Sequence, residues 1–211
     1  MRGIEPRSIA VVMFLLRVYP VKTFSRLRNL PLGQLLHTCA SLRGSSRQST
    51  EEFATVTALR ATARRALACQ HEAAEHEEQI HVLVQLVAPG LLAETGVGPV
   101  VAGQIIASWS HRGRVKSEAA FAKLAGVAPI EASSGTVTRH RLSRCGDRQL
   151  NRALHTIVIV RMRQDPRTKT YVARRLAEGK GIREIKRSLK RYVARHIFRE
   201  LEALPKTIDR T

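Results

Sequence analysis

The sequence predicts an all-α protein, in which a long coiled-coil-like helix precedes a helix-hairpin-helix-type helical domain with a basic loop or minor hairpin. Apolar residues recur at spacings of three and four over most of the chain after residue 48, which is the period of one face of an α-helix. Residues 49–88 contain neither proline nor glycine. The predicted parts are an irregular N-terminal segment, the long helix, a C-terminal domain and a tail, over residues 1–48, 49–88, 89–205 and 206–211.

The N-terminal segment is the least regular part of the sequence. Three prolines and a Gly-Ser-Ser stretch interrupt it, and only residues 33–42 favour a short helix. The longest apolar run is the eight residues from Ile9 to Leu16, which Arg17 ends. A run of this length is too short to span a bilayer, so we expect no membrane association.

The long helix begins with a capping box. Ser49 and Glu52 stand three residues apart, the spacing at which each side chain binds the backbone amide of the other residue. Pro89 and Gly90 end the helix. Its apolar stripe is thin, and a long helix of this kind gains stability mainly by packing. We therefore expect a coiled coil that makes the chain a homo-oligomer through residues 49–88.

Five further helices are expected in the C-terminal domain. Ser117 and Asp147 are predicted N-caps of two of them, and Pro166 ends one. β-Branched residues within 127–142 favour a loop with a small hairpin. The helices are expected over residues 100–106, 118–125, 148–165, 168–177 and 182–201.

Positive charge is concentrated in the C-terminal half. Of 36 basic and 17 acidic residues, 25 and 9 lie in residues 111–211, which gives this half +16 of the net +19. A one-sided positive field is typical of proteins that bind a polyanion, most often nucleic acid. Arginine outnumbers lysine here, and its guanidinium suits bidentate phosphate binding. Nucleic acid is therefore the expected partner.

Cysteine and histidine spacing argues against a metal site. The three cysteines lie far apart without a C-x-x-C motif, which excludes a disulfide scaffold and a cysteine-rich zinc module and indicates a reducing compartment, by default the cytoplasm. His71 and His76 are five residues apart and diverge around a helix. The Glu-x-x-His motif at residues 78–81 occurs once, whereas a di-iron bundle needs two. We expect neither a metal site nor a cofactor in this chain.

A glycine motif, Gly96-Val97-Gly98-Pro99, lies between two apolar helical segments. Glycines here let backbone amides converge on a phosphate at the positive end of the following helix. The alternative is a tight turn in which glycine relieves close packing, and the spacing alone favours neither. The surrounding positive charge favours phosphate, so Gly96 and Gly98 are candidate nucleic-acid-binding residues.

Two serines, Ser133 and Ser134, precede Gly135 in a basic loop. A loop serine most often has no chemistry; the alternative is a nucleophile for a phosphodiester, with arginines that stabilise the developing charge. His140 is a candidate base, without a carboxylate close in sequence to orient it. The candidate nucleic-acid-binding arginines are Arg139, Arg141, Arg144, Arg148 and Arg152.

Four motifs follow one another in a specific order: TGVGP at 95–99, SEAAFAKLAGVAP at 117–129, SSG at 133–135 and LSRCGDRQLNRAL at 142–154. On these motifs, residues 94–201 resemble the C-terminal domain of the guide-RNA-directed insertion-sequence transposases related to Piv-type DNA invertases. The resemblance implies that the serine directly before the glycine, Ser134, is the nucleophile that forms a phosphoserine bond with DNA in recombination. It also implies a structured guide RNA as a second partner.

Members of that family carry an N-terminal RuvC-like domain whose acidic residues bind divalent metal, so the resemblance implies that magnesium belongs to that domain. Here 48 residues precede the long helix, with one acidic residue, Glu5. We therefore expect a transposase fragment that binds DNA, contributes the serine nucleophile for DNA transposition and is inactive alone. Two alternatives stay open: a non-catalytic helix-hairpin-helix nucleic-acid-binding module, or a protein that dimerises through 49–88 and inhibits full-length transposase.

Overall fold

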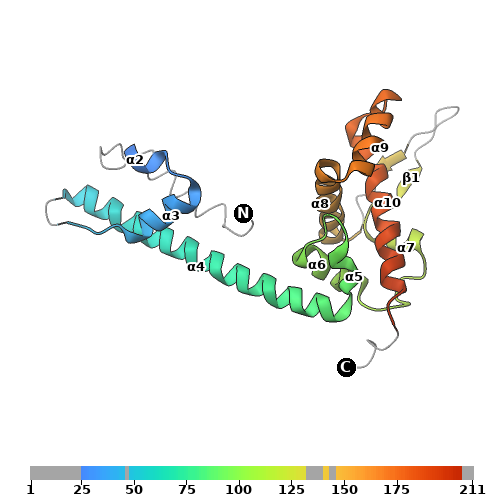
Figure 1. Ribbon diagram of the computed structural model, residues 1–211, viewed down its shortest axis with the longest axis horizontal. Helices are drawn as coiled ribbons and strands as arrows, with labels where there is room; N and C mark the ends of the chain where they lie inside the picture. Colours follow the sequence, from blue (N-terminus) through green and yellow to red (C-terminus); the bar gives the residue numbers. More distant parts are fainter. Residues whose placement is uncertain (1–24, 46–47, 132–139, 143–145, 206–211) are drawn as a thin grey trace. The chain divides into compact units, whose positions relative to one another are not determined.

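In the computed structural model, the described residues are 25–45, 48–131, 140–142 and 146–205. They are helical except for loops and one pair of three-residue strands, which confirms the predicted all-α class with a minor hairpin. The chain divides into two compact units, one up to Glu77 and one from Glu78, and helix α4 continues from the first into the second. Figure 1 shows the elements in chain order.

The described residues of the first unit form three helices: α2 (Ser25–Arg28), α3 (Leu32–Ser41) and the first part of α4 (Thr50–Val87). The capping box predicted at the start of α4 is present, because the Ser49 amide donates to Oε2 of Glu52 at 3.3 Å and the Glu52 amide donates to Oγ of Ser49 at 3.2 Å. The short helix expected over 33–42 corresponds to α3.

The core of this unit lies between α2, α3 and one side of α4. Four of its members are spaced at three or four residues on α4, so part of the apolar stripe of that helix is covered within the chain. Arg64 reinforces the contact, since its Nε donates to the carbonyl oxygen of Ala40 at 3.2 Å. The buried residues are Leu27, Leu35, Leu36, Cys39, Val56, Leu59, Ala63 and Ala66.

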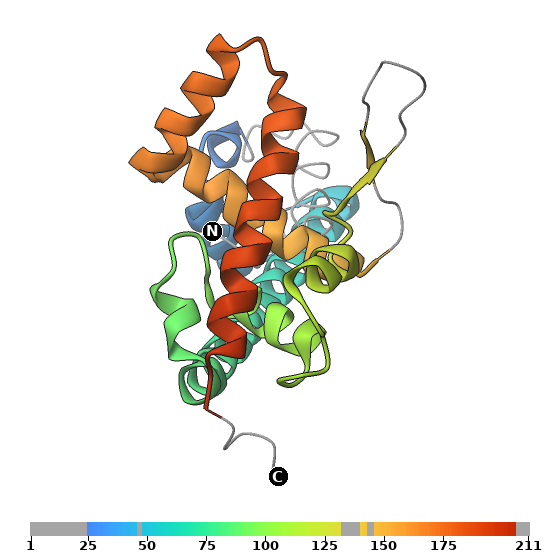
Figure 2. The same ribbon diagram turned by 90° about the vertical axis from the view of Figure 1, so that its right-hand side faces the viewer.

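The second unit gathers short helices around α8 and α10. In Figure 2, α10 lies across α8 and beside α7, and α6 also packs on α8. Phe121, Leu150, Leu154, Ile157 and Ile185 are among the fully buried side chains of its core. The helices after α4 are α5 (Pro89–Ala93), α6 (Pro99–Trp109), α7 (Glu118–Leu124), α8 (Arg148–Gln164), α9 (Pro166–Ala177) and α10 (Ile182–Glu202).

Side-chain caps fix where these helices begin. The two predicted caps are confirmed: the Ala120 amide donates to Oγ of Ser117 at 3.2 Å, and Oδ1 of Asp147 accepts from the first turn of α8. A third cap was not predicted. Asp165 follows α8 and accepts the Thr168 amide at 2.9 Å, so α9 begins two residues earlier than the sequence indicated.

The two strands, β1 (Pro129–Glu131) and β2 (His140–Leu142), pair antiparallel with Ile130 opposite Arg141. They connect α7 to α8 and carry the serine loop between them. Among the described helices, none combines the length and apolar character that a membrane span requires.

Candidate nucleic-acid interface

The hairpin of β1 and β2 is rooted at a point where only glycine fits. Gly146 has a φ of +115°, and a Cβ there would lie 2.5 Å from the carbonyl oxygen of Leu124 and 2.9 Å from the amide nitrogen of Gly126. The next residue, Asp147, donates its amide to the same Leu124 carbonyl at 2.7 Å. Gly146 and Asp147, which follow the hairpin in the chain and which we call its root, are thereby held against the end of α7.

Asp147 joins this root to α6. Its Oδ2 accepts the hydroxyl of Ser108 at 2.6 Å, and its Oδ1 accepts the amides of Gln149 and Leu150 at 2.8 and 3.0 Å. The Ser108 hydrogen bond is the main reason that the pKa of Asp147 lies below its usual value; burial opposes the shift and the two amides add to it. Because its oxygens are already engaged, Asp147 acts as an ionised structural cap.

The predicted catalytic residue and its neighbours fall largely outside the part of the chain that the structure describes. Ser133, Ser134, Arg139 and Arg144 are among those residues, so the nucleophile stays a prediction. Arg141 lies in β2.

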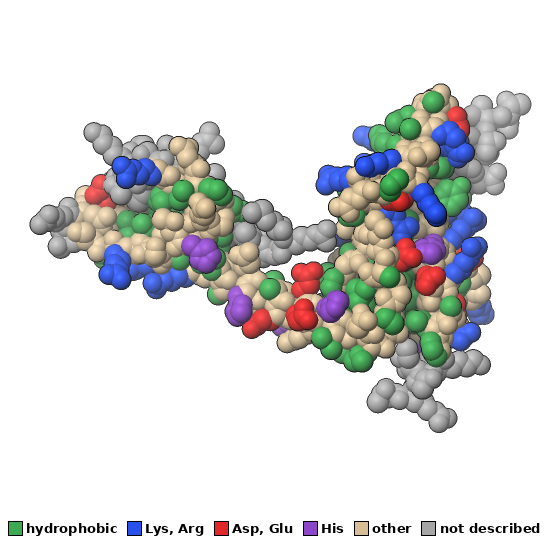
Figure 3. Space-filling model, viewed as in Figure 1, with side chains coloured by type: hydrophobic (Ala, Val, Ile, Leu, Met, Phe, Trp, Pro, Cys, Tyr) green, Lys and Arg blue, Asp and Glu red, His purple; other side chains and the backbone are tan. Residues whose placement is uncertain are grey.

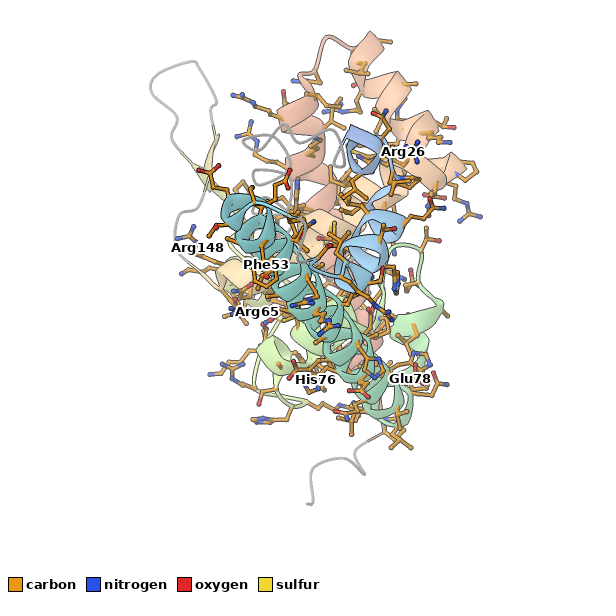
Figure 4. The ribbon with its side chains drawn as sticks, turned by 90° about the vertical axis from the view of Figure 1, so that its left-hand side faces the viewer. Arg26, Phe53, Arg65, His76, Glu78 and Arg148 are labelled. Carbon is orange, nitrogen blue, oxygen red and sulfur yellow. The ribbon has the colours of Figure 1, made fainter. Side chains whose placement is uncertain are left out.

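The other two predicted arginines lie together on α8. Arg148 and Arg152 stand four residues apart, hence on one face of the helix, and both are exposed. Figure 4 shows Arg148 at the start of α8. The structure therefore brings two of the candidate phosphate-binding side chains to the hairpin root.

Asn151, one residue before Arg152, ties three elements together. Its Nδ2 donates to the carbonyl oxygen of Ala125 at 2.7 Å, and its Oδ1 accepts from Nζ of Lys190 on α10 at 2.9 Å. Burial lowers the pKa of Lys190. Neither residue was predicted from the sequence, although Asn151 shares a helix face with Arg148.

Gly96 has the packing role that the sequence left open as an alternative. Its φ is +88°, and a Cβ there would lie 3.1 Å from both the carbonyl oxygen of Ile157 and Cβ of Val160 on α8. Gly98 differs, since its backbone is extended and it directly precedes Pro99 at the start of α6. Phosphate binding by Gly96 and Gly98 stays a prediction.

An ion-pair network closes the turn that contains these glycines. Oε2 of Glu94 lies 2.6 Å from a guanidinium nitrogen of Arg161, whose Nε also donates to the Thr95 carbonyl at 2.8 Å. Oε1 of Glu94 lies 2.8 Å from Nε2 of His196 on α10. Burial raises the pKa of Glu94, but His196 and Arg161 outweigh it, so the net shift is downward. We call Glu94, Arg161 and His196 the Glu94 clamp.

A cavity adjoins the Glu94 clamp between α8, α9 and α10. Its lining includes Arg161, Thr168, Tyr192 and His196. Tyr192 is 55 % exposed and meets the ring of Tyr171 edge-on, with centroids 6.1 Å apart. In Figure 3, Lys and Arg side chains cover α9 and one side of α10, which places the predicted positive surface on the second unit.

The acidic and histidine-rich part of α4 has the features of a solvated helix face. His71 pairs with Glu75 at 3.3 Å and His76 with Glu72 at 4.0 Å, and all four side chains are well exposed. Figure 4 shows His76 and Glu78 along this helix. Within the described ranges, no group of three or more His, Cys, Asp or Glu side chains is placed to hold a metal ion.

Comparison with known proteins relates this interface to transposases. Residues 90–173 match the model of the transposase IS116/IS110/IS902 family. That part of the chain resembles IS110 transposases. The chain is also 34 % identical over 107 residues to the insertion element IS110 uncharacterized 43.6 kDa protein of Streptomyces coelicolor.

The relative from Streptomyces is much longer than the shared region. The alignment covers 49 % of this chain and 26 % of that protein. The two findings support a relationship to the IS110 transposases and a transposase-type function. The matched residues 90–173 contain every candidate site residue of the sequence analysis, whereas α10 lies beyond them.

Proposed function

We propose that this chain binds DNA and contributes Ser134 as the nucleophile of a transposase. The observation that carries the proposal is the family match over 90–173, which spans the serine loop. The geometry of the described residues agrees with this role. A nucleophile must be held in a defined position, and Gly146 and Asp147 fix the root of the hairpin against α7.

In the proposed reaction, Oγ of Ser134 attacks the phosphorus of a DNA phosphodiester. An Oγ–P bond forms, one P–O bond to the neighbouring nucleotide breaks, and the released oxygen takes up a proton. A hydroxyl at another strand end then attacks the phosphoserine, which restores the serine and joins the exchanged strands. Arg148 and Arg152 supply positive charge close to the hairpin root, where charge develops on the phosphate oxygens.

The residues described at the hairpin root do not fit a magnesium site. Asp147 is a carboxylate at this root, and Ser108 and two backbone amides already bind its oxygens. A serine hydroxyl is a weak nucleophile until a base or a metal activates it. We therefore propose that this chain alone does not cleave DNA and that an acidic, metal-binding RuvC-like domain must act with it.

The test measures covalent protein–DNA adducts on denaturing gels, with magnesium present. The 211-residue chain alone should give no adduct, and adduct should appear when a RuvC-like acidic domain is supplied in cis or by a full-length partner. In that active assembly, Ser134→Ala should abolish the adduct, whereas the matched control Ser133→Ala should leave most of it. Adduct that survives Ser134→Ala would contradict the nucleophile assignment.

A second candidate is a non-catalytic nucleic-acid-binding module, including one that interferes with a full-length transposase. The observation that favours it is the exposed basic surface over α9 and one side of α10, which needs no serine to bind phosphate. DNA binding without adduct in the assembled system would favour this candidate. In either function, we propose that a structured guide RNA binds as a second phosphate-bearing ligand.

We also propose that residues 49–88 make the chain a homo-oligomer. Support comes from the last turns of α4, where Leu83 and Leu86 are 61 % and 75 % exposed. Leucines this exposed gain free energy when a second helix covers them. Sedimentation should show a dimer or larger species at about ten micromolar. The double substitution Leu83→Lys with Leu86→Lys should shift this species toward monomer. An unsubstituted chain that stays monomeric well above micromolar concentration would contradict the proposal.

A further inference from the structure

The contact between α8 and α10 carries positive charge that the proposed function does not use. Lys186 and Lys190 stand four residues apart on α10, and His155 on α8 lies close enough to feel both charges. We call His155, Lys186 and Lys190 the α8–α10 cation cluster. Asn151 fixes its position by accepting from Lys190 at 2.9 Å.

The cluster lies beside the root of the serine hairpin. Asn151 donates to the carbonyl oxygen of Ala125, four residues before β1 begins at Pro129. On α8, Arg148, Arg152 and His155 follow at spacings of four and three, so they form one row along the helix. That row leads from the hairpin root to the cluster.

Three described carboxylates on the neighbouring elements have partners outside the cluster. Asp147 is held by Ser108 and two amides. Glu184 on α10 pairs with Lys180 at 3.3 Å, and Glu118 on α7 pairs with Arg199 at 2.5 Å. The positive charges of the cluster are therefore not offset by these acids.

Such a cluster costs free energy in the free protein. Burial lowers the pKa of Lys190, and burial followed by the charges of Lys190 and Lys186 lowers the pKa of His155. Both shifts mean that the protonated forms are disfavoured where they stand. An ammonium group has three N–H donors, and Asn151 takes one of those on Lys190. A bound anion would accept from the remaining donors and offset the repulsion.

We propose that the α8–α10 cation cluster binds a backbone phosphate of the DNA. The inference rests on the proposed function and extends it to α10, beyond the residues that match the transposase family. A phosphodiester is the acceptor that fits, because it carries a full negative charge and can accept from Lys190 and His155 together.

The first test compares Lys190→Gln with Lys169→Gln, an equal loss of charge at an exposed position of α9. Binding of the 211-residue chain to a labelled DNA duplex is followed by fluorescence anisotropy at several salt concentrations. Lys190→Gln should weaken binding about tenfold and reduce the slope of log K against log salt by about one, whereas Lys169→Gln should change affinity by less than about twofold.

The second test uses pH, because a bound phosphate favours protonated His155. DNA affinity should rise as pH falls through the pKa of His155 in the complex, and His155→Gln should reduce this rise. The charged groups that act on His155 are Lys186 and Lys190, so the same titration is run on Lys190→Gln, and on Lys190→Met in case the first variant unfolds. Thermal melting identifies variants that have lost the fold.

The outcomes distinguish failure of the proposed function from failure of the cluster proposal alone. No DNA binding by the unsubstituted chain would remove the proposed function and the cluster with it. Binding that Lys190→Gln and Lys169→Gln weaken equally would overturn the cluster alone. The third arm repeats the comparison with a matched RNA duplex. If Lys190→Gln lowers the affinity for RNA but leaves the affinity for DNA intact, the assignment to a DNA phosphate is also overturned.

Discussion

The two sides of the α8–α10 crossing carry similar basic side chains in opposite settings. On one side, the carboxylate of Glu94 lies between Arg161 and His196 and binds both helices to the turn before α6. On the other side, Lys190, Lys186 and His155 approach one another next to Asn151, a neutral amide. The first arrangement is closed within the chain, and the second leaves charge for a ligand.

This difference separates structural cations from binding cations more clearly than exposure or net charge does. A cation paired with a half-buried carboxylate stabilises the fold and has little left to offer a phosphate. A cation whose partner is an amide keeps its full charge for an external anion. The net +16 of residues 111–211 is therefore not a uniform binding surface.

Breaking the Glu94 clamp should have the largest effect on stability. Glu94→Gln keeps the size of the side chain but leaves Arg161, which is 17 % exposed, without its counter-charge. Removing one partner of a largely buried ion pair is strongly destabilising, so we expect a loss of about 2–3 kcal/mol in the free energy of unfolding. Urea denaturation at neutral pH measures it.

The matched control for that substitution is Glu178→Gln. Glu178 pairs with Arg174, which is 68 % exposed, and with Arg175. Surface pairs contribute little, so the expected loss is under about 1 kcal/mol. Equal losses at Glu94 and Glu178 would mean that the Glu94 clamp is no more structural than a surface pair.

The two glycines of the turn should respond differently. Gly96→Ala places a Cβ 3.1 Å from the Ile157 carbonyl at a φ of +88°, and we expect a loss of about 1–2 kcal/mol in unfolding free energy. Gly98 is extended and precedes α6, so Gly98→Val should weaken DNA binding while leaving the helical circular dichroism unchanged. Unfolding of the Gly98→Val chain would instead make both glycines packing residues.

Local sequence patterns predicted the helices well because their determinants are local. The capping box of Ser49 and Glu52, the caps at Ser117 and Asp147, and the apolar period of α10 each act within a few residues. The cover of α3 over the first part of α4 was not predicted. A stripe that fits a coiled coil fits a partner in the same chain equally well, because both bury the same side chains.

The candidate site was predictable only in part. Motif and charge singled out Arg148 and Arg152, which α8 does bring to the hairpin root. They missed Asn151, Lys190 and the Glu94 clamp, because those contacts join residues 39 to 102 positions apart in the sequence. Nothing local distinguishes the lysine that contacts an amide from the arginine that contacts a carboxylate.

Lowering the pH should reduce the free energy of unfolding in two successive steps, one for each side of the crossing. The step that arises from His155 should be the smallest effect. The pKa of His155 is lowered in the folded chain, so as pH falls below the ordinary value of 6.5 the unfolded chain takes up a proton first and stability declines. The pKa of Glu94 is also lowered, so its contribution is complete above the ordinary value of 4.5 and is lost as pH falls through the folded-state pKa.

Urea denaturation between pH 7.5 and 3 resolves these two windows. His155→Gln should remove part of the upper decline and leave the lower one, whereas Glu94→Gln should reduce only the lower one. DNA should reverse the upper decline, because a phosphate at the α8–α10 cation cluster favours the protonated histidine. The DNA-bound chain could instead lose as much stability over the upper window as the free chain does. That result would show that neither side of the crossing binds an anion in preference to the other.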